Sequence, residues 1–260
     1  MKELVGCPYC RGPLVPHWNA PRFDRCNGCG LVLRNPFPSE ADLSALYERA
    51  WDRPDENTGE TGEFDAALAQ QYARAILKVV PSAVGEHPCV LDFGAGKGAL
   101  MRALGAEGCD VSGVEPYGFE RLHANGLKVY KSLSDLPGGT RFDGIVSFDV
   151  VEHLREPWKA IAQFSDHLKP GGWLLVGTPN PSGLNAVLHK SGWREASKLG
   201  HILFMNSSTL SQILSGAGFK SIKRTSLDIR FKGDFVWDRV VHPVLRLLNL
   251  DGGTVVLAMY

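Results

Sequence analysis

Hydrophobic positions change their spacing in a regular way from about residue 90 onward. Short apolar runs, which are typical of buried strands, alternate with segments in which apolar residues recur every three or four positions, as in amphipathic helices. The apolar runs cover residues 90–93, 111–115, 127–130, 144–148 and 172–178. The helical segments cover residues 99–106, 119–125 and 158–168. This alternation predicts an α/β domain with a mainly parallel sheet and helices on both faces.

The same patterns divide the rest of the chain. A helix is predicted over 208–217, followed by strands over 219–225 and 254–259. Near the N-terminus, Ser39 and Asp42 form a capping box for a helix that runs to Tyr47. Apolar residues recur with helical spacing again over 64–80. The polar, aperiodic stretch 52–63 between the two helices is predicted to be a linker. We therefore expect a module over 1–38, a helical linker and cap over 39–80, and a main domain over 81–260.

Composition narrows the class of protein. The 260 residues include 28 Lys and Arg against 28 Asp and Glu, so the formal net charge is zero, which argues against a surface built throughout for nucleic acid. No apolar run approaches the roughly 18–20 residues that a membrane span needs. The N-terminus also lacks the apolar core of a signal peptide. These features favour a cytoplasmic protein without membrane contact, with a small molecule as its weakly favoured partner.

Four of the six cysteines lie in the first 29 residues, as the pairs Cys7-x2-Cys10 and Cys26-x2-Cys29. Two such pairs, separated by fifteen residues, have the spacing of a zinc ribbon, in which four thiolates complete a closed tetrahedral site for structural Zn²⁺. A pair of redox dithiols is the alternative. Gly12 and Gly30 are expected to let backbone N–H groups approach the sulfurs, and the remaining cysteines, Cys89 and Cys109, to be buried and inert.

A glycine-rich turn follows the first strand of the main domain. Glycines at 94, 96 and 98 allow the backbone to pass close to a ligand at the start of the next helix. The carboxylate of Asp92 would repel a pyrophosphate there, whereas the ammonium and sulfonium of S-adenosylmethionine suit it. Glu115 ends the next strand, where a carboxylate can accept both ribose hydroxyls, and Pro116 stops that strand. The turn therefore favours S-adenosylmethionine over a dinucleotide.

These segments resemble class I S-adenosylmethionine-dependent methyltransferases, in the subgroup near the ubiquinone-biosynthesis O-methyltransferases. The resemblance rests on LDFGAGKG (91–98), VSGVEP (111–116), FDGIVSFDVVEHL (142–154), LKPGGWLLVGTPN (168–180) and HILFMNSSTLSQILSGAGF (201–219). It implies a Rossmann-like, seven-stranded sheet whose last strand is antiparallel. It also implies a set of cofactor-binding residues: Asp92, Gly94, Ala95, Gly96, Glu115, Pro116, Ser132, Leu133, Phe148 and Asp149.

The segment Asp149-x2-Glu152-His153, together with the later His201, carries the candidate catalytic chemistry. It resembles the E-x-x-E-H…H metal site of small-RNA 2′-O-methyltransferases and of some ubiquinone O-methyltransferases, with Asp149 one methylene shorter than the usual glutamate. The resemblance implies a Mg²⁺ site at these four residues. Alternatively, Glu152 caps a helix and His153 acts in acid–base chemistry or contacts the substrate. The catalytic candidates are His153, Asp149 and His201.

Two insertions, over 181–200 and 230–252, are predicted lids that set acceptor specificity, because loops at the carboxyl ends of parallel strands shape the pocket. Trp193 or Trp237 is a candidate for stacking on the acceptor. Instead of forming a lid, the second insertion could form a dimer contact or pack into the core. The chain is thus predicted to methylate a small molecule, on an oxygen of a natural product, quinone-like compound or sugar. An RNA methyltransferase and a non-catalytic cofactor-binding adaptor remain the alternatives.

Overall fold

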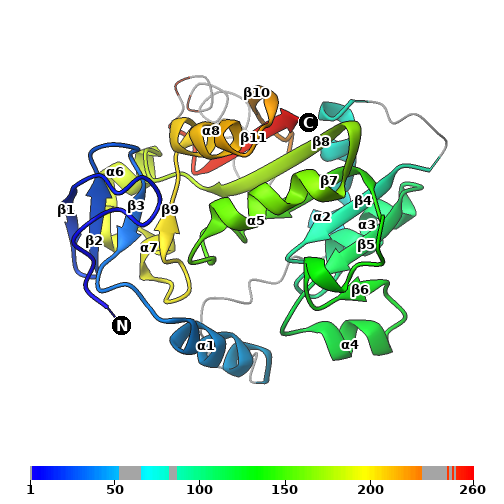
Figure 1. The fold of residues 1–260 in the computed structure, drawn as a ribbon, viewed down its shortest axis with the longest axis horizontal. Coiled ribbons are helices and arrows are strands. Elements are labelled where there is room, and N and C mark those ends of the chain that lie inside the picture. The colour runs from blue at the N-terminus through cyan, green and yellow to red at the C-terminus, as the bar shows by residue number, and fades with distance from the viewer. Residues whose placement is uncertain (1, 53–65, 82–86, 230–244, 246–247, 249) are drawn as a thin grey trace.

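The computed structural model describes residues 2–52, 66–81, 87–229, 245, 248 and 250–260 (Figure 1). Most of the predicted linker at 52–63 and most of the predicted lid at 230–252, with Trp237, lie outside the described residues.

The elements follow one another as the hydrophobic pattern predicts. The strands are β1 (Leu14–Asn19), β2 (Arg22–Cys26), β3 (Val32–Arg34), β4 (Cys89–Phe93), β5 (Asp110–Val114), β6 (Val129–Tyr130), β7 (Phe142–Phe148), β8 (Leu168–Pro179), β9 (Leu203–Phe204), β10 (Lys220–Thr225) and β11 (Gly253–Met259). The helices are α1 (Glu40–Asp52), α2 (Ala66–Val79), α3 (Ala99–Ala106), α4 (Phe119–Ala124), α5 (Pro157–Phe164), α6 (Leu184–His189), α7 (Arg194–Ser197) and α8 (Ser207–Gly216). Short 3-10 turns cover η1 (Leu133–Asp135), η2 (Ser165–His167) and η3 (Lys190–Gly192).

Seven strands form the main sheet in the order β10-β11-β8-β7-β4-β5-β6. The pairs from β8 through β6 are parallel, and β11 runs antiparallel between β8 and β10. This topology confirms the predicted Rossmann-like sheet with its antiparallel last strand. Several boundaries differ: α1 runs past Tyr47 to Asp52, and β6 is shorter than predicted. The helix expected to reach residue 168 ends at Phe164, because a 3-10 turn follows and β8 already begins at Leu168, which pairs with Phe142 of β7.

Each face of this sheet is covered by helices. On one face, α5 and α8 pack with Ile161, Phe164 and Leu210 onto inward side chains of β4, β7, β8 and β11. On the other face, α2 and α3 pack with Ile76 and Leu104 onto the alternate side chains of the same strands. The alternation of faces along each strand explains why these strands read as continuous apolar runs. The strands therefore end at a common edge between the two helix layers.

The N-terminal cysteine module forms a second, smaller sheet with the order β1-β2-β3-β9 (Figure 1). Its fourth strand comes from far along the chain, since Val32 pairs with Phe204 and Leu33 with Leu203. Side chains from both partners share a buried aromatic cluster in which Trp18 and Phe23 meet Trp193 and Phe204. The module, called the ribbon below, is thus built into the main domain through β9.

Candidate active site

A cavity of about 1880 Å³ opens at the carboxyl ends of the parallel strands. Its walls include the ends of β4, β5, β7 and β8, the predicted insertion at 181–200, and helix α1. Trp51 of α1 packs against Gly118 at the start of α4, where a Cβ would overlap its ring. Helix α1 therefore forms one wall of the cavity, although it lies before the main sheet in the sequence.

Asp92 and Glu115 lie at the ends of the neighbouring strands β4 and β5, and both are nearly fully buried. Glu115 holds the glycine turn by accepting hydrogen bonds from the N–H groups of Gly96 (2.9 Å), Tyr117 (3.0 Å) and Gly118 (3.2 Å). Asp92 makes no hydrogen bond or ion pair with any residue that the structure describes. Burial, together with the nearby Glu115 charge, raises the pKa of Asp92 to about 7. Burial also raises the pKa of Glu115.

Gly94 is required at its position for two reasons. Its φ is +83°, in the left-handed region that glycine adopts freely, and a Cβ there would overlap the side chain of Val150. Gly96 also has a positive φ, +51°, but a Cβ there would meet nothing. The turn therefore leaves open space beside Gly96, where the backbone faces the cavity.

These features fit S-adenosylmethionine. Two buried acids face a cavity without a described cationic partner, so a ligand with an ammonium and a sulfonium would supply the missing positive charge. The other predicted contacts line the same cavity: Ala95, Pro116, Ser132, Leu133, Phe148 and Asp149. The structure thus brings the predicted cofactor residues together, and their individual roles stay predictions.

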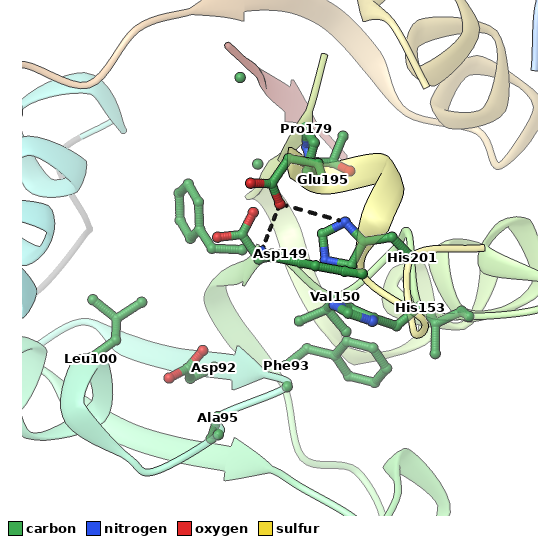
Figure 2. A pocket seen from close by; sticks show the side chains of 18 of the residues that line it. Asp92, Phe93, Ala95, Leu100, Asp149, Val150, His153, Pro179, Glu195 and His201 are labelled. Carbon is green, nitrogen blue, oxygen red and sulfur yellow. Dashed lines mark ion pairs between the residues drawn. The ribbon is translucent and has the colours of Figure 1, made fainter. Parts of the chain in front are cut away.

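Asp149 lies between this cofactor side and the histidine cluster (Figure 2). It follows β7 with a φ of +52°, an uncommon conformation for a residue with a Cβ, and its N–H donates to the Gly177 carbonyl (2.9 Å). Its side chain is exposed and lines the cavity. Burial raises the pKa of Asp149 to about 6, opposed by the neighbouring positive charge of Lys198.

Tyr47 of α1 reaches the site and contacts His153. Its hydroxyl lies 2.7 Å from His153 Nδ1 and donates to the Gly200 carbonyl at 3.2 Å. His153 Nδ1 lies 3.1 Å from the same carbonyl, so we assign the proton to Nδ1, which then donates to both oxygens. Burial lowers the pKa of His153 to about 4, and the ring is therefore neutral at pH 7.

His201 packs edge-on against His153, with ring centroids 4.6 Å apart. Its Nδ1 lies 3.6 Å from Glu195 Oε2, and the same oxygen lies 2.6 Å from Lys198 Nζ (Figure 2 draws the ion pairs). Glu152 is fully buried beneath them and accepts a hydrogen bond from Thr178 Oγ1 (2.9 Å). The acceptor side of the cavity is therefore polar and contains both signs of charge.

Glu152, His153 and His201 place one ligand atom each within 4.8 Å of one another. Asp149 does not belong to this group, so the predicted set of four is reduced to three. Mg²⁺ prefers six oxygen ligands in octahedral geometry, whereas this group offers one carboxylate and two imidazoles. Those donors suit a transition metal better than Mg²⁺. Because the residues do not fit the predicted ion, no step proposed below uses it.

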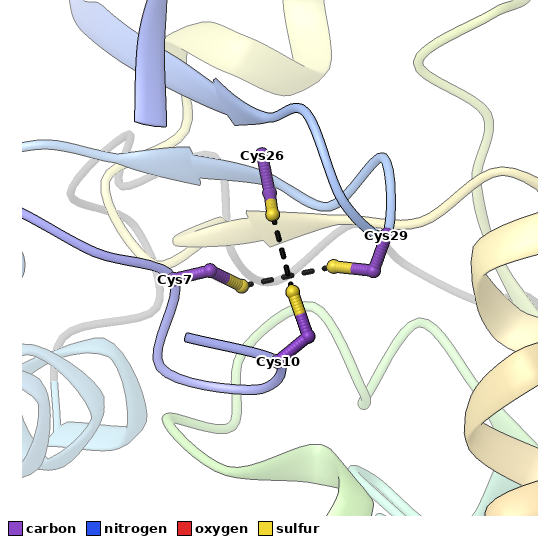
Figure 3. A group of neighbouring side chains, drawn as sticks. All are labelled: Cys7, Cys10, Cys26 and Cys29. Carbon is purple, nitrogen blue, oxygen red and sulfur yellow. Dashed lines mark hydrogen bonds between the residues drawn. The ribbon is translucent and has the colours of Figure 1, made fainter. Parts of the chain in front are cut away.

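The four ribbon cysteines point toward one point (Figure 3). The sulfurs of Cys7 and Cys29 lie 3.7 Å apart and those of Cys10 and Cys26 lie 3.3 Å apart, and all four cysteines are free of disulfides. Zn–S bonds of about 2.3 Å put the sulfurs of a tetrahedral site about 3.8 Å apart. The hydrogen bond between Cys7 and Cys29 lowers the pKa of Cys7 to about 5 and raises that of Cys29. The cluster therefore fits Zn²⁺.

Two details of the cysteine predictions need correction. Gly12 does donate to Cys10 Sγ (3.4 Å), but the second such donor is Gly28, to Cys26 Sγ (3.3 Å), and not Gly30. Gly30 instead turns the chain with a φ of +77°. Cys109 is buried as expected. Cys89 is partly exposed, because it is the first residue of β4.

The predicted insertion at 181–200 borders the cavity, with His189 and Arg194 in its wall. Trp193 is only 6% exposed, and its ring packs 5.0 Å from Phe204 and 6.0 Å from Trp18. It thus joins the insertion to the ribbon and also lines the cavity, so its contact with an acceptor stays a prediction.

Comparison with known proteins supplies the family. A family model described as "Methyltransferase domain" matches residues 64–223, more than half of the chain. The chain belongs to this family. It is a class I S-adenosylmethionine-dependent methyltransferase, as the resemblance implies.

Individual relatives show the same fold at low identity. A ubiquinone biosynthesis O-methyltransferase from Idiomarina loihiensis is 28% identical over 217 residues, which cover 73% of this chain and 82% of that protein. A methyltransferase from Thermotoga maritima, described as a possible histamine N-methyltransferase, superposes with a TM-score of 0.57 at 16% identity, covering 84% of this chain and 99% of that chain. The 1,6-didemethyltoxoflavin-N1-methyltransferase of Burkholderia thailandensis superposes with a TM-score of 0.51 at 19% identity, covering 94% and 98%.

Sequence reasoning missed Tyr47, Glu195 and Lys198. All three line the cavity, but no spacing in the sequence marks them. Tyr47 looks like an ordinary apolar position of a helix, and the other two like surface charges. Only the fold brings them next to His153 and His201.

Proposed function

We propose that this methyltransferase methylates a hydroxyl oxygen of a small phenolic acceptor and that Asp149 accepts the hydroxyl proton. The proposal depends on one observation: the Asp149 carboxylate opens into the cavity between the cofactor side and the polar acceptor side (Figure 2). The relatives named as ubiquinone biosynthesis O-methyltransferases support an aromatic hydroxyl acceptor.

The acidity of the two groups favours a phenol over a sugar hydroxyl. Burial raises the pKa of Asp149 to about 6, so its carboxylate is ionised at pH 7 but is still a weak base. A phenol, with an ordinary pKa near 10 as in tyrosine, is far easier to deprotonate than an alkyl alcohol. A proton acceptor of this strength therefore suits a phenolic hydroxyl.

Different residues of this chain would bind the cofactor, accept the proton and orient the acceptor. Bound S-adenosylmethionine supplies the activated methyl group, and the surroundings of Asp92 and Glu115 hold it. Asp149 takes the acceptor proton at a carboxylate oxygen. Glu195, Lys198 and His201 bind the polar groups of the acceptor and orient its oxygen, which contributes through positioning. Tyr47 fixes His153 beside them.

We also propose that the ribbon over 1–38 holds one structural Zn²⁺ at its four cysteines. Four thiolates complete the coordination sphere, so such an ion has no open position for chemistry. Its contribution would be folding energy for a module too small to supply enough of its own.

The test is a methyl-transfer assay with labelled S-adenosylmethionine on separate panels of catechols, sugars and total RNA. We expect label on the catechols. The Asp149→Asn variant should lower kcat, measured at saturating S-adenosylmethionine, by about 10²- to 10⁴-fold. Asp166→Asn, which changes an exposed aspartate on η2, is the matched control.

The pH profile separates Asp149 from other bases. At saturating S-adenosylmethionine, kcat should fall below about pH 6, because protonated Asp149 no longer accepts a proton. Asp149→Asn should lack this acidic limb. Label only on sugars or only on RNA would contradict the phenolic acceptor, and an unchanged kcat in Asp149→Asn would contradict the assigned base.

A further inference from the structure

The segment 194–201 carries most of the acceptor side of the cavity. It contains helix α7, the ion-paired Glu195 and Lys198, and His201. Leu199, within it, is 61% exposed, and the apolar residue that anchors the segment is Ala196, which is buried in the aromatic cluster shared with the ribbon. Its position must therefore come from neighbouring elements.

Arg34, the last residue of β3 in the ribbon, contacts this segment directly. Its Nη2 donates to the Ala196 carbonyl (3.1 Å) and to the Lys198 carbonyl (2.8 Å). The guanidinium carbon also lies 4.8 Å from the centre of the Phe23 ring, which fixes the side chain from the ribbon side. A planar, charged guanidinium holds such carbonyls more firmly than a flexible ammonium does.

Three further contacts join the ribbon to the same region. The backbone of β3 pairs with β9, two residues after His201. The Arg34 N–H donates to the Ile202 carbonyl (2.8 Å). The hydroxyl of Thr209 donates to the carbonyl of Cys29, one of the four clustered cysteines (2.9 Å). The ribbon therefore contacts the chain on both sides of His201.

We propose that Arg34 is a positioning residue, through which the ribbon holds segment 194–201 in the geometry that binds the acceptor. This role rests on the proposed function, because it assigns Glu195, Lys198 and His201 to the acceptor. Arg34 is absent from the lining of the described cavity; it donates to the two carbonyls, and its positive charge helps to lower the pKa of His201. The cofactor side, formed by other strands, does not depend on it.

The experiment compares Arg34→Met with Arg25→Met, both in the full-length protein. Methionine keeps an apolar stem over Phe23 and removes the donors, whereas Arg25 is an exposed arginine on the neighbouring strand. The first readout is backbone hydrogen exchange over 194–204, which needs no activity. The second readout is the acceptor KM, which is compared with kcat and with the Kd for S-adenosylmethionine.

We expect Arg34→Met to exchange about 10-fold faster over 194–204 and to raise the acceptor KM about 10-fold, the size of a lost charged hydrogen bond. The Kd for S-adenosylmethionine should stay within about 2-fold of wild type, since that site keeps its contacts. Arg34→Lys should recover part of both effects. Arg25→Met should match wild type.

Two results would overturn the role: wild-type exchange over 194–204 in Arg34→Met, or faster exchange with an unchanged acceptor KM. The metal content of the cysteine cluster is measured in wild type and in Arg34→Met. If Arg34→Met has lost that metal, the same hydrogen-exchange and KM measurements on Arg34→Lys test the role of Arg34 instead. Faster exchange confined to Arg34 variants, in a protein that methylates none of the phenols, would support the positioning of the segment and refute the proposed acceptor. The two failures are therefore distinguishable.

Discussion

The two sides of the cavity are built in different ways. The cofactor side comes from one continuous stretch of chain, in which β4, the glycine turn and β5 place Asp92 and Glu115 within 23 residues. The acceptor side combines α1, the turn after β7, segment 194–201 and, through Arg34, the ribbon. The first side is set by local sequence, and the second only by the assembled fold.

Charge differs between the sides as well. Asp92 has no described partner and a raised pKa, so the cofactor side is incomplete without a cation. On the acceptor side, Lys198 and His201 both face Glu195, and Tyr47 is hydrogen-bonded to His153. One side thus gains a cationic partner on binding, whereas on the other side Glu195 and Lys198 are already paired with each other. Changes on one side should therefore leave the other side intact.

The largest effect is expected from loss of the cluster metal. Wild type should contain about one zinc per chain by elemental analysis, and Cys10→Ser should contain little. Because structural zinc supplies a large part of the folding energy of a small module, Cys10→Ser should melt well below wild type. At low temperature its affinity for S-adenosylmethionine should persist, since the cofactor side contains no ribbon residue.

Cys89→Ser is the control for this prediction, because it changes a partly exposed cysteine outside the cluster. It should keep its zinc and its melting temperature. Full zinc in Cys10→Ser, or equal loss of cofactor and acceptor binding, would contradict the independence of the two sides.

The next effect concerns the acids of the cofactor side. Asp92→Ala and Glu115→Ala should each weaken S-adenosylmethionine binding by about 30- to 100-fold, the size expected when a charged hydrogen bond is lost. Titration calorimetry measures the change. Asp110→Ala is the matched control, since it changes an exposed aspartate at the opposite end of the same strand as Glu115. Wild-type affinity in both variants would place the cofactor elsewhere.

The comparison also explains what the sequence could predict. The parallel sheet and the meeting of Asp92 with Glu115 follow from short continuous apolar runs and from the rule that parallel strands end at one edge. The antiparallel last strand follows only from the resemblance to class I methyltransferases. The contact between Tyr47 and His153 spans 106 residues, and β3 pairs with β9 across about 170 positions of chain. No local pattern encodes such contacts, because they depend on how α1 and the ribbon pack. For the same reason the sequence predicts an acceptor contact for Trp193, but it does not predict that this ring packs against Phe204 and the ribbon residue Trp18.

A smaller effect is expected at Tyr47. Tyr47→Phe removes the hydroxyl beside His153 Nδ1, but the Gly200 carbonyl stays 3.1 Å away as a partner. We therefore expect only about a 3- to 10-fold loss of kcat, the size of one neutral hydrogen bond. Affinity for S-adenosylmethionine should not change. Tyr9→Phe, which removes a ribbon hydroxyl bonded to the Gln212 carbonyl, is the control, and an equal loss in both variants would show a general packing effect.

The smallest effect is a gain in stability. The pKa of Asp92 is about 7 in the folded protein and near 4 in an unfolded chain, so between these values the folded state binds the extra proton. The free energy of unfolding therefore falls as pH rises through this range. Above pH 7 the carboxylate is ionised and buried, and the whole destabilisation is present. Without cofactor, Asp92→Asn should raise the melting temperature at pH 8, by about 2–4 °C for each 1 kcal/mol relieved, and change it little at pH 4. Differential scanning calorimetry at the two pH values measures this. An equal shift at both would mean that the burial of charge at Asp92 is not the cause, and that the cofactor side is no less balanced than the acceptor side.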